Sequence, residues 1–147
     1  MPRYLLAFAL VFFAHTFSVQ AQTVMAEPEP DFDNPRKVLI SLNEKDEKRV
    51  NTVLNNVMNI QKAYGPDNVQ LVLVAYGPGI WSVLKDSPVR KRIESMMIYE
   101  VEFVACGNTL DGIHKTREDT IDGVGWARAG LQEVIERRLQ GWVDLKP

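Results

Sequence analysis

The sequence has little of what most enzyme active sites are built from. It holds one cysteine, Cys106, and two histidines among 147 residues. The Gly-x-Ser-x-Gly motif of serine hydrolases is absent, and so are the glycine spacings of phosphate loops and dinucleotide folds. After the first 21 residues one histidine remains, and no tight carboxylate cluster accompanies it. We therefore expect no metal site and no cofactor.

Acidic side chains are absent from the first 26 residues, and all 19 lie from Glu27 onward. This first segment has a single base, Arg3, followed by an apolar run over residues 5–14 and then Val19-Gln20-Ala21. Such a layout is typical of a secretory signal peptide. The apolar run is half of the roughly 20 residues that a membrane span needs. We expect residues 1–21 to be cleaved after Ala21, leaving an exported, periplasmic protein without a membrane anchor.

Clusters of basic residues are also scarce in the chain that would remain. Cleavage removes one base and no acid, so the net charge falls from −2 to −3 over 126 residues. A mildly acidic chain of this kind is a poor candidate for binding nucleic acid or anionic lipid. Residues 22–35 carry Glu27-Pro28-Glu29-Pro30 and are expected to form a flexible leader. Residues 36–147 are expected to form one domain.

Strand and helix patterns alternate through this domain. Asn43 is the expected cap of the first helix, and Ser87-Pro88 is expected to open the second. The run over 69–75 is apolar at nearly every position, as in strands covered on both faces. The pattern predicts an α/β three-layer sandwich, with a mostly parallel sheet of about five strands and helices on both faces. Strands are expected at 38–42, 69–75, 101–105 and 142–145, with a turn and a further short strand within 122–127. Helices are expected at 46–64, 88–97, 110–114 and 131–139.

Ligand sites in such sheets lie beyond the carboxyl ends of the strands. Two segments are expected there. One is Gly77-Pro78-Gly79 with Trp81, which would form the edge of a pocket, and the other is Cys106 with Gly107 and Asn108.

Cys106 has three interpretations from the sequence. It is a reactive thiolate at the start of a helix, a buried and inert thiol that ends a strand, or half of a disulfide between subunits. His114 follows eight residues later. It is a candidate base for the thiol, although the position on a short helix favours a surface imidazole over that role. Three tryptophans in a small acidic domain favour self-association.

From about Lys37 to Pro147 the chain resembles the DsrE/DsrF-like family, which has the YchN-like fold and includes an exported branch. The resemblance is carried by VLISL, VQLVLVAYGPGI, VEFVACGNTL with its terminal Cys106, and LQEVIERRLQGWVDLKP. It implies a compact α/β domain that assembles as a trimer or hexamer.

Sulfur-relay members of the family carry sulfur as a persulfide on a cysteine at this position. The resemblance thus implies that Cys106 accepts sulfur from a donor protein and passes it to an acceptor. The alternative is a non-catalytic oligomeric module that binds a small ligand or partner, with a structural Cys106.

Overall fold

The computed structural model describes residues 23–147, so the expected signal peptide over residues 1–21 lies outside the described residues. Residues 23–35 contain no helix or strand. The chain enters the sheet at Arg36. Within residues 23–147 no helix is both long enough and apolar enough to cross a membrane.

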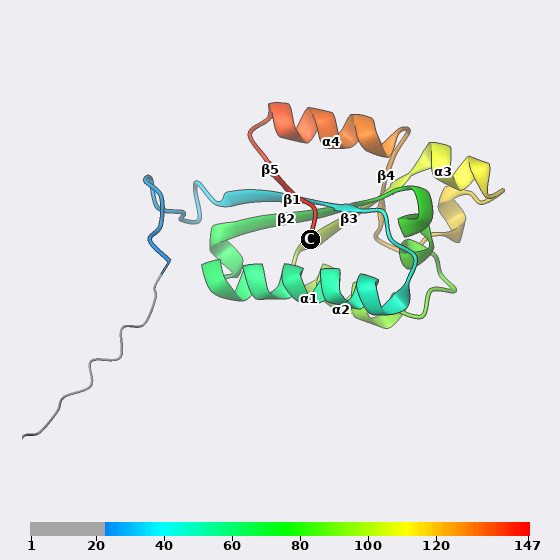
Figure 1. Ribbon diagram of the computed structural model, residues 1–147, viewed down its shortest axis with the longest axis horizontal. Coiled ribbons are helices and arrows are strands. Elements are labelled where there is room, and N and C mark those ends of the chain that lie inside the picture. Colours follow the sequence, from blue (N-terminus) through cyan, green and yellow to red (C-terminus); the bar gives the residue numbers. More distant parts are fainter. Residues whose placement is uncertain (1–22) are drawn as a thin grey trace, which may run out of the picture.

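Five parallel strands form the sheet, as Figure 1 shows. They are β1 (Arg36–Leu42), β2 (Val69–Ala75), β3 (Val101–Cys106), β4 (Gly125–Ala127) and β5 (Val143–Leu145). Their order is β4-β3-β2-β1-β5, and every neighbouring pair is parallel. The predicted α/β class and strand number are confirmed. The sheet is entirely parallel rather than mostly so.

Helices cover both faces of the sheet and make three layers. α1 (Glu47–Tyr64) and α2 (Arg90–Ile98) lie on one face, and α4 (Gly130–Leu139) lies on the other (Figure 1). α3 (Gly107–Gly112) follows directly on β3. Three short 3-10 helices complete the described chain, namely η1 (Pro66–Asn68), η2 (Gly77–Val83) and η3 (Arg117–Asp119).

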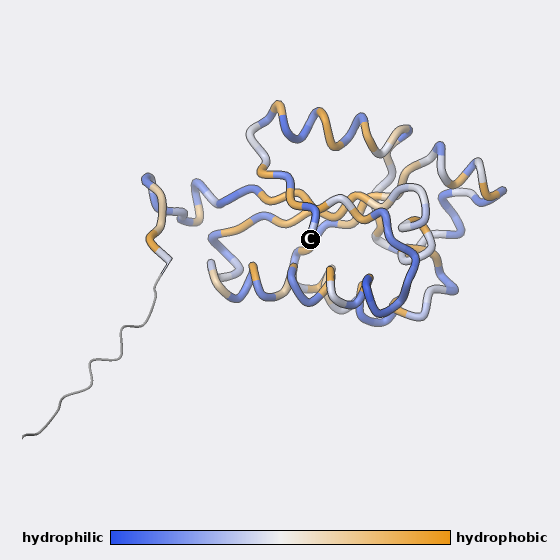
Figure 2. Tube along the Cα trace, in the orientation of Figure 1, coloured by the Kyte–Doolittle hydropathy of each residue, from blue (hydrophilic) through white to orange (hydrophobic). Residues whose placement is uncertain are grey.

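The two faces of the sheet bury unequal cores. The large core lies between the sheet and α1 and α2, and Phe103 is one of its fully buried members. The smaller core joins Leu39, Val72, Val74 and Val104 of the strands to Val134 of α4. Figure 2 shows the apolar strands at the centre, with helices that alternate between polar and apolar residues. The strands are therefore covered on both sides, which accounts for the continuous apolar run over residues 69–75.

Three helix starts differ from the sequence prediction. The carboxylate of Asp46, rather than Asn43, caps α1 by accepting a hydrogen bond from the Arg49 N–H at 2.9 Å. The Asn43 side chain lies against Gly77 instead. α2 begins at Arg90, because Ser87 and Pro88 form a turn in front of it. α3 begins at Gly107 rather than at residue 110, so its first turn follows Cys106 without a loop.

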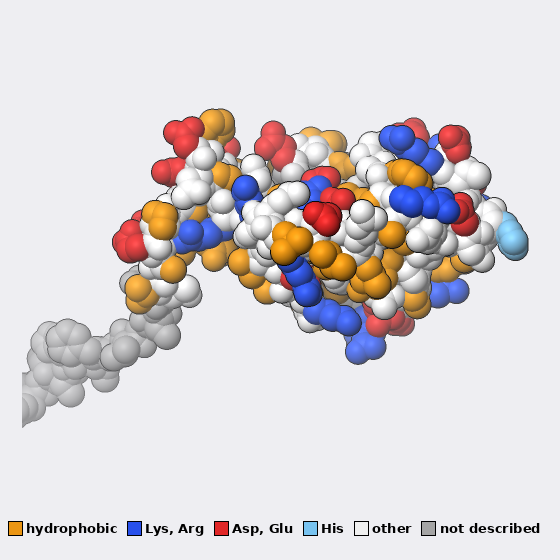
Figure 3. Space-filling view, turned by 90° about the horizontal axis from the view of Figure 1, so that it is seen from above, with side chains coloured by type: hydrophobic (Ala, Val, Ile, Leu, Met, Phe, Trp, Pro, Cys, Tyr) orange, Lys and Arg blue, Asp and Glu red, His pale blue; other side chains and the backbone are white. Residues whose placement is uncertain are grey.

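α4 carries an outward apolar row that we call the α4 stripe, made of Leu131, Ile135 and Leu139. These side chains are 57%, 54% and 77% exposed, whereas Val134 is buried. Spacing of four residues places the three on one side of the helix. The helix therefore has a narrow contact with the sheet and a second apolar side that faces away from it. Figure 3 shows the molecule from above, the side on which α4 lies in Figure 1, with hydrophobic side chains exposed among charged ones.

Candidate functional site

Three strand ends converge at the carboxyl edge of the sheet. β2 leads into η2, β3 leads into α3, and β4 leads through a short turn into α4. The backbone of η2 lies directly against the end of β1, because a Cβ on Gly79 would come within 2.0 Å of the Leu42 carbonyl oxygen. Only glycine permits this approach. The segment over residues 77–79 is thus held in place by the sheet itself.

Cys106 is the last residue of β3 and the residue that precedes α3. Its side chain is 6% exposed, so it is buried in the single chain. The N–H of Gly130, the first residue of α4, donates a hydrogen bond to Sγ at 3.1 Å. A Cβ on Gly130 would lie 3.0 Å from the Cys106 Cβ, so the close approach depends on glycine. The thiol therefore sits at the amino end of α4, where a negative charge is favoured.

Thr109 connects the thiol to the Gly77 turn. The Gly77 N–H donates to Thr109 Oγ1 at 3.1 Å. The Thr109 side chain also acts on the Cys106 thiol and lowers its pKa. Because Oγ1 accepts from Gly77, its own proton is free to point at the sulfur. Thr109, which was not among the predicted site residues, thus links the two segments that the sequence predicted at this edge.

These donors lower the pKa of the Cys106 thiol below its ordinary value. Burial has the largest single effect and acts in the opposite direction. The Thr109 hydroxyl and the backbone N–H groups of Gly130, Thr109 and Asn108 together outweigh it. The Asn108 N–H also donates to the Arg128 carbonyl at 3.0 Å. Hydrogen bonds to the charged form favour the thiolate, which is the nucleophilic form of cysteine.

Trp126 covers the residue next to the thiol. Its indole ring occupies the space beside Gly107, where a Cβ would lie 2.7 Å from the ring. The residue is 42% exposed, so its outer side borders solvent. Trp126 pairs with Ala105 in the β3–β4 register, and the next residue, Ala127, pairs with Cys106.

Thr109 and Gly130 were not predicted as site residues, although the sequence contains a signal for each. Thr109 lies three residues after Cys106, so it completes the first turn of α3. Gly130 precedes the apolar pattern of the last helix. Neither signal can be used without knowing that α3 and α4 both begin beside the end of β3, because the first residues of these helices supply the groups that reach the sulfur.

Two other predicted site residues do not reach the thiol. His114 is exposed, lies beyond α3 in a left-handed backbone conformation (φ 55°), and is not among the groups that hydrogen-bond to Cys106. Trp81 lies beside Lys45, whose Nζ is 5.1 Å from the centre of the ring. It lines a cavity of about 40 Å³, close to the roughly 30 Å³ that one water molecule occupies in the liquid. Within residues 23–147 no group of three His, Cys, Asp or Glu side chains is placed to hold a metal.

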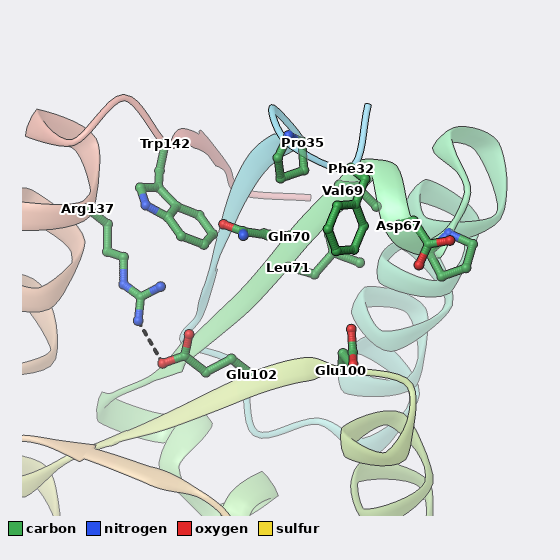
Figure 4. A pocket seen from close by; sticks show the side chains of 11 residues that line it. Phe32, Pro35, Asp67, Val69, Gln70, Leu71, Glu100, Glu102, Arg137 and Trp142 are labelled. Carbon is green, nitrogen blue, oxygen red and sulfur yellow. Dashed lines mark hydrogen bonds and ion pairs between the residues drawn. The ribbon is translucent and has the colours of Figure 1, made fainter. Parts of the chain in front are cut away.

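A larger cavity of about 420 Å³ lies at the opposite, amino edge of the sheet (Figure 4). The basic residue of its lining is Arg137, which pairs with Glu102 at 2.6 Å and with Glu133 at 2.7 Å. The guanidinium also stacks on Trp142, 4.7 Å from the ring centre. Burial acts to lower the pKa of Arg137, but the two carboxylates raise it overall. Since its charge is already satisfied within the chain, this cluster is explained by its structural role.

Known structures share this fold. The protein of unknown function MTH1491 from Methanobacterium thermoautotrophicum is 28% identical, with a TM-score of 0.73 over 76% of this chain and 99% of that one. The ychN protein from E. coli is 17% identical, with a TM-score of 0.63 over 76% of this chain and 99% of its own. BT1422 from Bacteroides thetaiotaomicron, a conserved protein of unknown function, is 18% identical, with a TM-score of 0.60 over 76% of this chain and 94% of its own.

No protein-family model and no curated protein matches the sequence. The expected YchN-like fold is confirmed by the structural neighbours.

Proposed function

We propose that the protein carries sulfur on Cys106 as a persulfide. The observation that carries the proposal is the position of the thiol at the amino end of α4, with the Gly130 N–H 3.1 Å from Sγ. This arrangement stabilises a negatively charged sulfur, and the terminal sulfur of a persulfide has the same requirement. The fold relationship to YchN-like proteins is consistent with this role.

The step is a transfer of sulfane sulfur without net oxidation. The Cys106 thiolate attacks the terminal sulfur of a donor persulfide, R–S–SH, and forms a new S–S bond. The S–S bond of the donor breaks, and the donor leaves as the thiolate R–S⁻. Passage to an acceptor thiol repeats the step in the other direction. Each step is an ordinary thiolate exchange through an in-line S–S contact.

Access to the thiol depends on Trp126. Since Cys106 is 6% exposed, a donor reaches it only if a neighbour moves. The indole beside Gly107 is the exposed side chain at that point, and it can turn outward without leaving a gap in either apolar core. The donor is therefore a small persulfide, or one presented on a flexible chain end.

The test is persulfidation of the folded protein, followed by mass spectrometry. Purified residues 22–147 are treated with glutathione persulfide, and the intact mass is measured before and after reduction. We expect the intact mass to increase by one sulfur atom and dithiothreitol to reverse the gain. Cys106→Ser is the matched control and gains none. If the folded protein stays unmodified while the urea-unfolded protein reacts, the thiol is structural and the proposal fails.

We also propose that copies of the chain assemble through the α4 stripe, as a homo-oligomer. The support is three apolar side chains, each more than half exposed, on one side of one helix. Rows of this kind are covered in stable oligomers. Analytical ultracentrifugation of the protein should show an assembly that Ile135→Asp dissociates, whereas the exposed polar change Gln132→Asp should leave it intact. A monomeric wild-type protein contradicts the assembly.

Export sets the compartment for both proposals. The support is the signal-peptide pattern of residues 1–21. Fractionation of cells that express the full chain should yield a periplasmic product beginning at Gln22. A full-length cytoplasmic product would place the thiol in a reducing environment and contradict the export proposal.

A further inference from the structure

A groove lies beside the first half of β3, away from the Cys106 edge. β3 covers residues 101–106, but β4 pairs only with its last part, Val104–Cys106. On the inner side the whole of Val101–Ala105 pairs with β2. Within residues 23–147, no strand therefore continues the sheet outward beside Val101, Glu102 and Phe103. An open strand edge of this kind can accept a further strand.

The groove has an apolar floor. Its volume is about 650 Å³, and its apolar lining comes from Met97, Ile98, Val101 and Phe103. Ile98 is 79% exposed, although it is a large aliphatic side chain at the end of α2. The floor extends from the end of α2 to the strand edge. A chain lying along β3 would thus find apolar surface on one side and backbone groups on the other.

The charged lining of the groove is entirely acidic. It consists of Glu94, Glu100, Glu102 and Asp122, and no Lys, Arg or His lines the groove. Three of these carboxylates have ion-pair partners outside the lining, namely Arg90, Arg137 and Lys85. Among the described ion pairs none involves Glu100, which has a left-handed backbone conformation (φ 63°). Four carboxylates and three paired cations leave one net negative charge at the rim, that of Glu100. The surface that an occupant would meet is therefore apolar with a weakly negative rim.

We infer that this groove binds an extended segment of another protein, in which apolar residues alternate with lysine or arginine. The segment adds as a strand beside Val101–Phe103, sets its apolar side chains on Met97 and Ile98, and brings its basic side chains to the rim. Strand geometry places alternate side chains on opposite faces, which suits a floor on one side and a rim on the other. About three residues, or roughly 10 Å of chain, cover the open edge.

A second copy of this chain does not fit the groove. Its densest basic run, Arg90-Lys91-Arg92, begins α2 and is helical, so it cannot extend along a strand edge. The chain is also acidic overall, with a net charge of −2. A basic partner is attracted by the rim, whereas a second acidic copy gains nothing from it. The inference is independent of Cys106 chemistry, which takes place at the opposite edge of the sheet.

The probe is a fluorescein-labelled peptide of sequence Lys-Val-Arg-Val-Lys-Val, and its binding is measured by fluorescence anisotropy. We expect saturable binding that weakens as salt rises. A peptide with glutamate at each basic position should not bind. A peptide of the original sequence, N-methylated at alternate residues so that it cannot donate to β3, should bind at least tenfold more weakly.

Two double variants separate the groove from general charge attraction. Glu94→Gln with Asp122→Asn removes two rim charges and should weaken binding about fivefold, the effect expected of two exposed ion pairs. Asp86→Asn with Glu136→Gln removes one Asp and one Glu elsewhere on the surface and is the matched control. Ile98→Ser tests the apolar floor at an exposed position, so it should leave the circular dichroism spectrum unchanged while it weakens binding.

The inference is overturned by any of three results. The peptide fails to bind, the glutamate peptide binds equally well, or the control variant loses as much affinity as the groove variant. If the Glu94→Gln, Asp122→Asn variant loses binding while persulfidation of its Cys106 is unchanged, the groove is supported and the proposed function is left intact.

Discussion

Replacing Thr109 by valine tests the electrostatic role of its hydroxyl at Cys106. Valine has nearly the same shape but no hydroxyl, so the donor to Sγ is lost while the packing is retained. The Gly77 N–H, 3.1 Å from Oγ1 in the wild-type protein, loses its acceptor at the same time. We therefore expect the pKa of Cys106 to rise and the protein to become less stable.

Hydrogen-bond strengths give the size of both effects. A hydrogen bond to a charged group contributes about 1.5–3 kcal/mol. Losing a contribution of this size disfavours the thiolate relative to the thiol, so the pKa of Cys106 should rise. An unsatisfied backbone N–H costs about 1–3 kcal/mol. Because Gly77 is only partly buried and water can reach it, we expect a loss of stability near the lower figure.

The pKa is measured by the ultraviolet absorbance of the thiolate as the pH is raised, with Cys106→Ser as the blank. This readout does not require a reagent to reach the buried sulfur. Thr109→Ser keeps the hydroxyl and should keep the wild-type pKa, while urea unfolding reports the stability of each variant. If Thr109→Val and Thr109→Ser have the same thiol pKa as the wild-type protein, the hydroxyl does not stabilise the thiolate and the reasoning fails.

Further predictions concern the same edge of the sheet. Because folding lowers the pKa of Cys106, its ionisation stabilises the fold above the ordinary thiol pKa of about 8.5, and this contribution is lost as the pH falls through the lowered value. The free energy of unfolding of the wild-type protein relative to Cys106→Ser should thus rise from neutral pH to about pH 9.5, and a flat difference would contradict the lowered pKa. Gly79→Ala places a Cβ 2.0 Å from the Leu42 carbonyl oxygen, so it should cost at least about 3 kcal/mol in urea unfolding. Gly107→Ala meets only the partly exposed Trp126 ring, so it should cost about 1 kcal/mol and speed alkylation of Cys106; equal losses in the two alanine variants would show that backbone contact is not the deciding factor.

The fold could be predicted from the sequence because its signals are strong and local. The apolar run over residues 69–75 and the helical spacing after Asp46 are visible without a structure. Helix starts were less predictable, since Asn43 and Asp46 are both good caps. The choice between them depends on Gly77, a residue distant in sequence against which the Asn43 side chain lies.

The candidate site was predictable only in part. Cys106 could be placed at the carboxyl edge because it ends a strand pattern. The groups that donate to its sulfur could not be predicted, because the β3–β4 pairing is what brings Gly130 to Cys106. The outward orientation of the α4 stripe could not be predicted from the sequence, for another reason. Apolar spacing marks a helix with an apolar side, but the pattern does not say whether that side meets the sheet or another surface.

The pairing of β5 with β1 brings the two ends of the domain together. Val38 pairs with Val143, and Ser41 approaches Asp144, 103 residues away in sequence, to 3.5 Å. During synthesis β1 therefore keeps one hydrogen-bonding edge open until Val143–Leu145 have emerged. Loss of β5 would leave β1 as an unprotected edge strand, where another chain can pair. We therefore expect that a product lacking Val143–Leu145 aggregates, rather than folding with lower stability.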